Sequence, residues 1–166
     1  AHLATRLLQL ARADANLGQQ EQRHDLRPVV DTVVREFTER SDAPLDIIVN
    51  DQLLQAMMVQ MDPNAFALIL RNLIENAERH GDPASPITIE LGQDWSVSVK
   101  NHGQVVPKDV LTTLKERFKR GQSESFGTGL GLAIADKLAL QSGGKLLLHS
   151  PATGFDNGFE GRLKLP

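Results

Sequence analysis

Polar residues near the end of one apolar-periodic segment, 64–80, are spaced in a way that suits chemistry. Asn72, Asn76 and Arg79 stand at i, i+4 and i+7, so a helix would place them on one face, with His80 just beyond. Asparagine is a mediocre helix former, so two stacked one turn apart need a reason. Carboxamide oxygens can ligate Mg²⁺ while phosphates complete its coordination, and an arginine can neutralise those phosphates. The pattern therefore predicts a site for a phosphorylated ligand and its cation.

A solvated polar face explains the same residues without a ligand. In that interpretation Glu75 forms ion pairs with Arg71 and Arg79, each four residues away. Both interpretations stay open from this segment alone.

A glycine stretch shifts the balance toward a ligand. Gly127, Gly129 and Gly131 lead directly into the next apolar-periodic segment. Glycine costs conformational entropy in a helix lead-in, whereas a helix N-terminus attracts anions and glycines let the backbone wrap them. The stretch lacks the Lys-Ser/Thr pair of a P-loop and the preceding buried strand of a Rossmann motif. Together with the asparagine face it favours a phosphate site.

The segment 63–80 is the strongest helix prediction in the chain. Asp62 can cap the helix, Pro63 suits its first position and Gly81 can end it. Its expected core face consists of Phe66, Ile69, Leu70, Leu73, Ile74 and Ala77.

Shorter elements surround this helix. Residues 26–43 predict an amphipathic helix with Val29, Val33 and Phe37 on one face. A hairpin is expected to turn at 92–94, and two strands are expected to flank a turn at 50–51. The other predicted elements are helices over 107–121 and 130–144 and strands over 44–50, 54–61, 86–92, 95–101, 145–150 and 161–166. The order predicts an α/β sandwich, with a mixed sheet covered on one face by helices.

An N-terminal helix is expected to precede this sandwich. Its seam, spaced four and three residues apart, consists of Leu3, Leu7, Leu10, Asp14 and Leu17. Residues 18–25 then form a polar linker. Either the helix packs on its own domain, or it is one half of a helical hairpin whose other half belongs to a longer chain, from which this sequence would be a fragment.

Composition excludes several classes of function. The formal net charge is −3, which gives no basic footprint for nucleic acid. The chain has no cysteine, so disulfides and thiolate metal sites are excluded. No apolar run reaches the ~18–20 residues of a membrane span. His102 and His149 stand in no metal-ligand spacing and are interpreted as incidental.

Three motifs in order resemble the C-terminal half of bacterial sensor histidine kinases. "NLIENAERHG" at 72–81 resembles the N box, "ERFKRG" at 116–121 the F box, and "GTGLGLAIADKLALQSGG" at 127–144 the second glycine box. The resemblance implies the Bergerat ATP-binding α/β sandwich shared with gyrase-type and Hsp90-type ATPases. It implies Mg²⁺ and ATP as cofactors, and transfer of the γ-phosphate to a histidine for relay to a response regulator.

The resemblance also assigns roles to residues. Asn76 would ligate Mg²⁺, and residues 107–126 would form a lid over ATP. The nucleotide-binding set would be Asn72, Asn76, Arg79, His80, Asn101, Gly103, Phe118, Gly127, Thr128, Gly129, Leu130, Gly131 and Leu132. Within that set, Phe118 would anchor the lid. Asn72 stands where the related ATPases carry a water-activating glutamate, so slow hydrolysis is expected. Glu75 is an alternative base, and Arg120 a candidate phosphate contact.

The first glycine box departs from the family's Asp-x-Gly-x-Gly. "VKNHGQVVP" at 99–107 puts Asn101 in place of the aspartate, keeps Gly103 and replaces the second glycine with Val105. An amide oxygen accepts a hydrogen bond from the adenine amino group without charge assistance, which weakens it by ~1–2 kcal/mol. Val105 is expected to stiffen or crowd the loop.

The phosphoacceptor is expected outside this chain. "HDLRP" at His24 imitates the family's acceptor motif but is one residue short before Pro28. The predicted division is 1–23, second helix of the dimerisation and phosphoacceptor hairpin with linker, and 24–166, catalytic ATP-binding domain. The resemblance implies a homodimer through the hairpin and a cytoplasmic fragment of an inner-membrane protein, with no nucleic-acid partner. Two alternatives stay open: a degenerate module with little turnover, and a clamp-type ATPase of the same fold.

Overall fold

A five-stranded mixed sheet lies at the centre of the computed structural model, which describes residues 22–40, 45–53, 55–116 and 130–166. Strands β2 and β4 run parallel, and the other neighbours are antiparallel. The strands, in spatial order, are β2 (Ile47–Asp51), β4 (Ile87–Gly92), β5 (Ser96–Asn101), β7 (Phe159–Lys164) and β6 (Lys145–His149).

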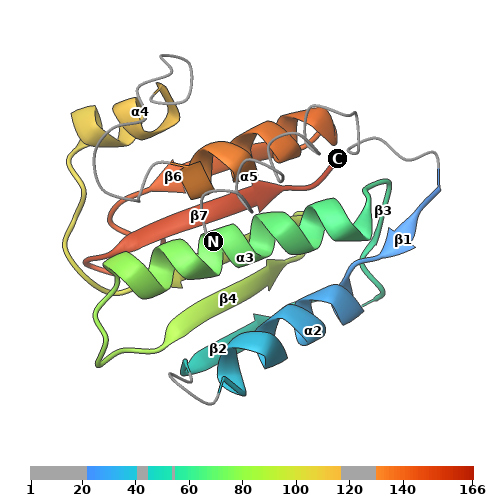
Figure 1. Cartoon of the computed structure of the whole chain (residues 1–166), viewed down its shortest axis with the longest axis horizontal. Helices are drawn as coiled ribbons and strands as arrows, with labels where there is room; N and C mark the ends of the chain where they lie inside the picture. The colour runs from blue at the N-terminus through green and yellow to red at the C-terminus, as the bar shows by residue number, and fades with distance from the viewer. Residues whose placement is uncertain (1–21, 41–44, 54, 117–129) are drawn as a thin grey trace.

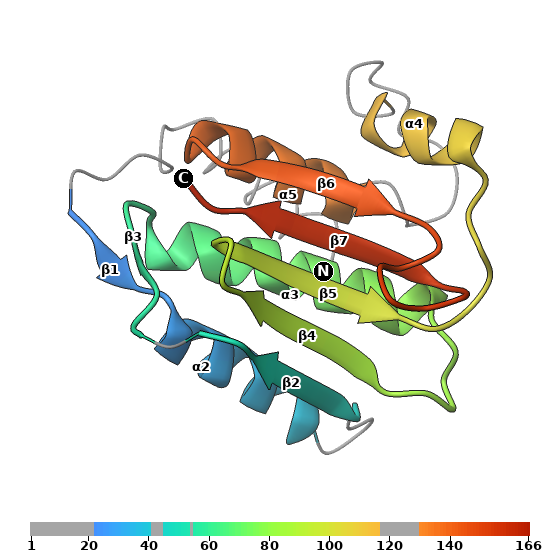
Figure 2. The same cartoon turned by 180° about the vertical axis from the view of Figure 1, so that it is seen from behind.

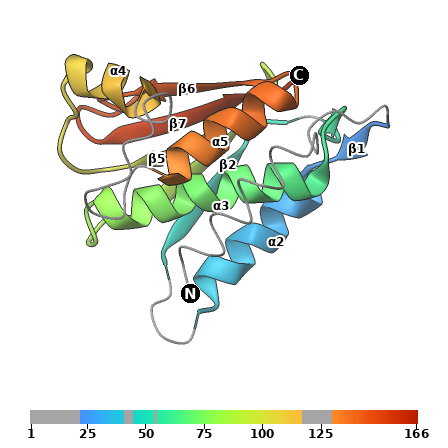
Figure 3. The ribbon, with the colours of Figure 1, turned by 45° about the horizontal axis from the view of Figure 1, so that its top comes forward.

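Three helices cover one face of this sheet: α2 (Arg27–Thr38), α3 (Pro63–His80) and α5 (Leu130–Gln141). They lie side by side in front of the strands in Figure 1, and the view from behind in Figure 2 looks onto the opposite face of the sheet. Helix α4 (Lys108–Glu116) lies beyond the end of the sheet where β5 and β6 end. The predicted α/β sandwich with helices on one face is confirmed, and Figure 3 shows its two layers.

The core lies between the helix layer and the sheet. All six residues of the predicted core face of α3 are buried, because their 3.6-residue period turns them toward the strands. The Asp62 side chain accepts a hydrogen bond from the Asn64 amide at 2.8 Å, and Gly81 is the C-cap, as predicted. On α2 the buried valines are Val30 and Val33, whereas Val29 is only half-buried.

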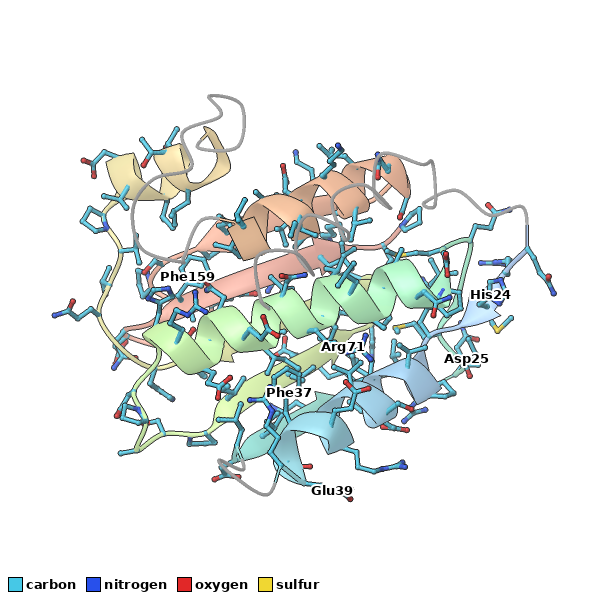
Figure 4. All side chains as sticks on the ribbon, viewed as in Figure 1. His24, Asp25, Phe37, Glu39, Arg71 and Phe159 are labelled. Atoms are coloured by element: carbon cyan, nitrogen blue, oxygen red, sulfur yellow. The ribbon has the colours of Figure 1, made fainter. Side chains whose placement is uncertain are left out.

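The strand predictions before α3 were wrong in two respects. Of the segment 54–61, only β3 (Met58–Val59) forms a strand, and it pairs with β1 (His24–Asp25) in a separate two-stranded sheet. The expected pairing of 44–50 with 54–61 is absent from the described residues, because β2 pairs with β4 instead. The end of the predicted linker is also a strand, because it pairs with β3, and the Asp25 carboxylate accepts hydrogen bonds from the Arg27 and Met57 amides. Figure 4 labels His24 and Asp25 on β1.

The remaining elements follow the prediction closely. Strands β4 and β5 form a hairpin, in which Gly92 pairs with Ser96. Strand β7 begins two residues earlier than expected, at Phe159. None of the helices in the described residues is long and apolar enough to cross a membrane. The predicted N-terminal helix at 1–17 lies outside the described residues.

Candidate functional site

The site lies where α3 ends, α5 begins and β5 ends, at the left of Figure 1. Asn76 is half-buried on the last turns of α3, and Arg79 and His80 are exposed beyond it. Partial burial, followed by the charge of Arg79, lowers the pKa of His80 from its usual 6.5. The lowered pKa favours the neutral imidazole, which suits contact with an uncharged ring or sugar.

The chain after α3 is bound tightly to the end of β5. The Gly81 amide donates to the Ala77 carbonyl at 2.8 Å, and the Asp82 amide donates to the His102 carbonyl at 2.8 Å. A Cβ atom at Gly81 would lie 2.5 Å from the Ala77 oxygen and 3.1 Å from the Asn101 Cβ. This close approach explains the glycine, and it brings the end of α3 against residue 101.

Asn101 is a buried polar side chain in this corner, with 4% of its surface exposed. Its Nδ2 donates to the His102 carbonyl at 2.9 Å, which fixes the orientation of the carboxamide. Its Oδ1 is buried, and none of the described residues donates a hydrogen bond to it. We refer to this oxygen as the open acceptor of Asn101.

Asn72 joins α3 to the start of α5. It is 4% exposed, and its Nδ2 donates to the Leu68 carbonyl one turn earlier, at 2.8 Å. Its Oδ1 faces α5, where a Cβ atom at Gly131 would lie only 3.1 Å away. The sequence prediction attributed Gly131 to a ligand alone, but close packing against Asn72 is a second reason that favours a residue without a side chain there.

Arg71, one of the two arginines that the solvated-face interpretation pairs with Glu75, forms an ion pair with a residue of another helix. Arg71 makes a bidentate pair with Glu36 of α2, with both N–O distances at 2.7 Å. This hydrogen bond lowers the pKa of Glu36 and raises that of Arg71, to which the nearby charge of Glu75 also contributes. Figure 4 shows Arg71 on the side of α3 that faces α2. Arg71 therefore links α3 to α2, on the side of α3 that faces α2.

Comparison with known proteins identifies the fold family. A profile described as histidine kinase-, DNA gyrase B-, and HSP90-like ATPase matches residues 61–166. The chain belongs to this family. It is 34% identical over 104 residues to the sensor protein VanSC of Enterococcus gallinarum, covering 59% of this chain and 29% of that protein. The chain thus spans less than a third of that relative.

Solved histidine kinases share the architecture. The mycobacterial sensor histidine kinase MprB aligns with a TM-score of 0.69 at 24% identity, over 87% of this chain and 96% of that one. Full-length ShkA in complex with AMPPNP aligns with a TM-score of 0.73 at 22% identity, over 99% of this chain and 35% of that one. The resemblance to the C-terminal catalytic domain of bacterial sensor histidine kinases is confirmed.

The family motifs fall only partly on described residues. Phe118, Arg120, Gly127, Thr128 and Gly129 lie outside them, so their roles stay predictions. Leu130 is half-buried and Leu132 buried at the start of α5, next to Gly131. No group of three or more His, Cys, Asp or Glu side chains in the described ranges is placed to hold a metal ion.

The first glycine box adopts a constrained path. Gly103 has φ +143°, and a Cβ atom there would lie 3.3 Å from the His80 carbonyl. Val105 is 49% exposed, and the expectation that it stiffens or crowds the loop stays a prediction.

The loop between β6 and β7, residues 150–158, was missed by sequence reasoning although it contacts this site. The ring of Phe155 stacks on His102 with centroids 4.2 Å apart, so His102 packs against this loop, and its interpretation as a residue that holds no ligand stays a prediction. The sequence signal was the pair Gly154 and Gly158, which both adopt positive φ angles.

Proposed function

We propose that this domain binds Mg-ATP and serves as the catalytic domain of a sensor histidine kinase. One observation carries the proposal: the open acceptor of Asn101 lies buried at the corner of the site. An unpaired buried acceptor costs ~1–3 kcal/mol, so its retention suggests that a ligand donor completes it. The amino group of adenine is such a donor, and the kinase family supplies the nucleotide as the expected ligand.

The α3 side of the site fits a phosphate chain and its cation. Asn76 would hold Mg²⁺ through its carboxamide oxygen, and Arg79 would offset charge on the phosphates. The start of α5 would offer backbone amides at Leu130, Gly131 and Leu132. Bound ATP supplies the phosphoryl group: its bond to the bridging β–γ oxygen breaks, a bond to an acceptor histidine nitrogen forms, and ADP leaves.

Asn72 and Glu75 have different roles in this proposal. Asn72 is buried against Gly131 and has no basic group, so it positions the start of α5 and does not activate water. Hydrolysis would then be slow, and the γ-phosphoryl group would be kept for the histidine. Glu75 is half-buried on the same helix and is the candidate base. Arg120 would contact phosphate from a lid anchored by Phe118.

The partners follow from the family and are part of the proposal. Residues 1–23 would belong to the dimerisation hairpin, the full protein would be a homodimer in the bacterial inner membrane, and a response regulator would receive the phosphoryl group. His24 pairs with Val59 through the strands β1 and β3. We expect the acceptor histidine on a helix outside this chain, so ATP alone should give no acid-labile phosphate on this chain.

A degenerate binding module of the same fold is the second candidate. The observation that favours it is the neutral Asn101, where the family has a carboxylate. Such a module would bind adenine nucleotides weakly and would transfer no phosphate to a supplied hairpin, whereas a kinase would do both.

Calorimetric titration with ATP, with and without Mg²⁺, tests the proposal. Asn101→Leu keeps the size of the side chain and removes the acceptor, so ATP should bind about fivefold or more weakly. Asn50→Leu makes the same change on the exposed edge strand β2 and should leave the affinity unchanged. Asn76→Ala should abolish the Mg²⁺-dependent part, and Asn64→Ala, exposed at the start of the same helix, should not. Equal ATP affinity in Asn101→Leu and the parent protein would contradict the proposal.

A further inference from the structure

The loop 150–158 is bound at its base to the segment that follows Asn101. The Gly158 amide donates to the Gly103 carbonyl at 2.9 Å. The Ser150 hydroxyl accepts from the Val106 amide at 2.8 Å and donates to the Gly158 carbonyl at 2.5 Å. Gly158 has φ +77°, and a Cβ atom there would lie 1.8 Å from the Asn101 carbonyl oxygen. The two segments therefore approach as closely as their backbones allow.

The tip of the loop contacts the residue next to the open acceptor. Phe155 and His102 stack at 4.2 Å with an interplanar angle of 5°. The Nδ1 of His102 lies 3.0 Å from the Oδ1 of Asn157, within hydrogen-bond distance. Two residues of the loop thus hold the ring of His102, whose carbonyl accepts the Asn101 amide.

The loop is itself fixed from below by charges on the sheet. The Lys100 ammonium donates to the Thr153 carbonyl at 3.0 Å, and the Thr153 amide donates to Glu160 at 2.9 Å. Burial alone would raise the pKa of Glu160, but hydrogen bonds from Thr153 and Ser98 outweigh burial, and the pKa is lowered. Both polar groups of the Thr153 backbone are therefore anchored by ionised side chains.

Residues 100–102 connect this anchored loop to the ligand side of the sheet. Alternation along β5 turns Asn101 toward the helices with Val97 and Val99, and Lys100 to the opposite face. The Lys100 ammonium lies 6.0 Å from the Phe155 ring centroid, which places Phe155 on that opposite face. The loop therefore lies on the face opposite the proposed base site, and the backbone of residues 100–102 connects the two.

We infer that Phe155 is a positioning residue for base recognition: by stacking on His102, it fixes the carbonyl that orients the Asn101 carboxamide, and so aims the open acceptor at an adenine amino group. This inference rests on the proposed function, because it concerns the same nucleotide site. A loop that served only to cover the sheet would have no influence on which base is preferred.

The test compares ATP with purine riboside triphosphate, which lacks the amino group. The parent protein should prefer ATP by about fivefold, the value of one ordinary hydrogen bond. In Phe155→Ala this preference should disappear while binding of purine riboside triphosphate is kept. Phe155→Tyr keeps the flat ring and should keep the preference. Asp156→Ala, at an exposed neighbour in the same loop, is the matched control and should also keep it.

The outcomes separate this inference from the proposed function. No ATP preference in the parent protein would contradict the base contact itself. A preference in the parent that survives in Phe155→Ala would overturn only the role of Phe155. Equal weakening for both nucleotides in Phe155→Ala would indicate a purely structural role and would also overturn it. If Phe155→Ala unfolds, Phe155→Leu retains the apolar volume without the flat ring, and the same loss of preference is expected.

Discussion

Lys100 and Asn101 are neighbours on β5, and each is 4% exposed, yet the two faces of the sheet treat them differently. On the face of the sheet opposite the helices, the Lys100 ammonium has two partners, Glu90 at 3.0 Å and the Thr153 carbonyl at 3.0 Å. On the helix face the open acceptor of Asn101 has no donor within the described residues. The two side chains are equally buried, but the Lys100 ammonium has hydrogen-bond partners and the Oδ1 of Asn101 has none within the described residues.

Under the proposed function, this difference separates polar groups that serve the fold from the Asn101 oxygen, which would serve a ligand. Glu160 on β7 is fully buried, but Thr153 and Arg162 satisfy its carboxylate. Such a network stabilises the sheet only while every member keeps its partner. An acceptor that stays open gains nothing for the folded chain, so substitutions on the two faces should affect different measurements.

Replacing Gly158, which approaches the backbone of Asn101 most closely, should cause the largest loss of stability. Gly158→Ala would place a Cβ atom 1.8 Å from the Asn101 carbonyl oxygen at φ +77°. We expect a loss of about 3 kcal/mol or more in the free energy of unfolding, measured by urea denaturation. Gly154→Ala is the matched control: its φ is +84°, and nothing described lies within 4 Å, so strain alone should cost about 1 kcal/mol. Similar losses in both variants would show that the close approach to Asn101 is unimportant.

Removing the Lys100 ammonium should cause the next largest loss of stability. Lys100→Met leaves Glu90 and the Thr153 carbonyl without their donor, and we expect a loss of about 2 kcal/mol in stability. Lys145→Met, at an exposed position on β6, should change stability by less than about 0.5 kcal/mol. By contrast, Asn101→Leu should cost little stability but should weaken the binding of ATP. Equal destabilisation by Lys100→Met and Asn101→Leu would contradict the distinction between a lysine that serves the fold and an asparagine that serves the ligand.

Acid should reveal the contribution of Glu160. Its pKa is lowered from 4.5 in the folded protein, so its ionised form stabilises the fold above the unfolded pKa. That contribution is lost as the pH falls through the lowered pKa. Glu160→Gln should therefore be less stable at pH 7 by about 1–2 kcal/mol, and the gap should narrow on acidification. A gap independent of pH between 7 and 3 would contradict this assignment.

Restoring the family carboxylate should produce the smallest effect. Asn101→Asp should strengthen ATP and ADP binding alike, because both carry adenine and a charged acceptor is stronger. The gain should stay below about tenfold, since a carboxylate cannot donate to the His102 carbonyl as Asn101 does at 2.9 Å. A nucleotide without the amino group should gain nothing. A weaker affinity for all three nucleotides would mean that residue 101 does not face the base.

The helix around Asn76 and the β4–β5 hairpin were predictable because their signals are local. A cap at Asp62, a proline at the first position and a 3.6-residue apolar period lie within one segment. The motif order likewise identified the family from sequence. The pairing of β2 with β4 and of β1 with β3 was not predictable, because strand pairing depends on distant segments that no local pattern names.

The sequence by itself determined the helix that carries Asn72 and Asn76, the alternation of β5 and the family resemblance, since these depend on residue types and spacing along one segment. Only the tertiary structure decided which polar groups find partners. It placed Asn72 against Gly131, enclosed Lys100 and Glu160 beneath the loop 150–158, and left the open acceptor of Asn101 on the other face. Hydrogen-bond satisfaction is a property of three-dimensional neighbours, and residues 100, 131 and 153 become neighbours of their partners only when the chain folds.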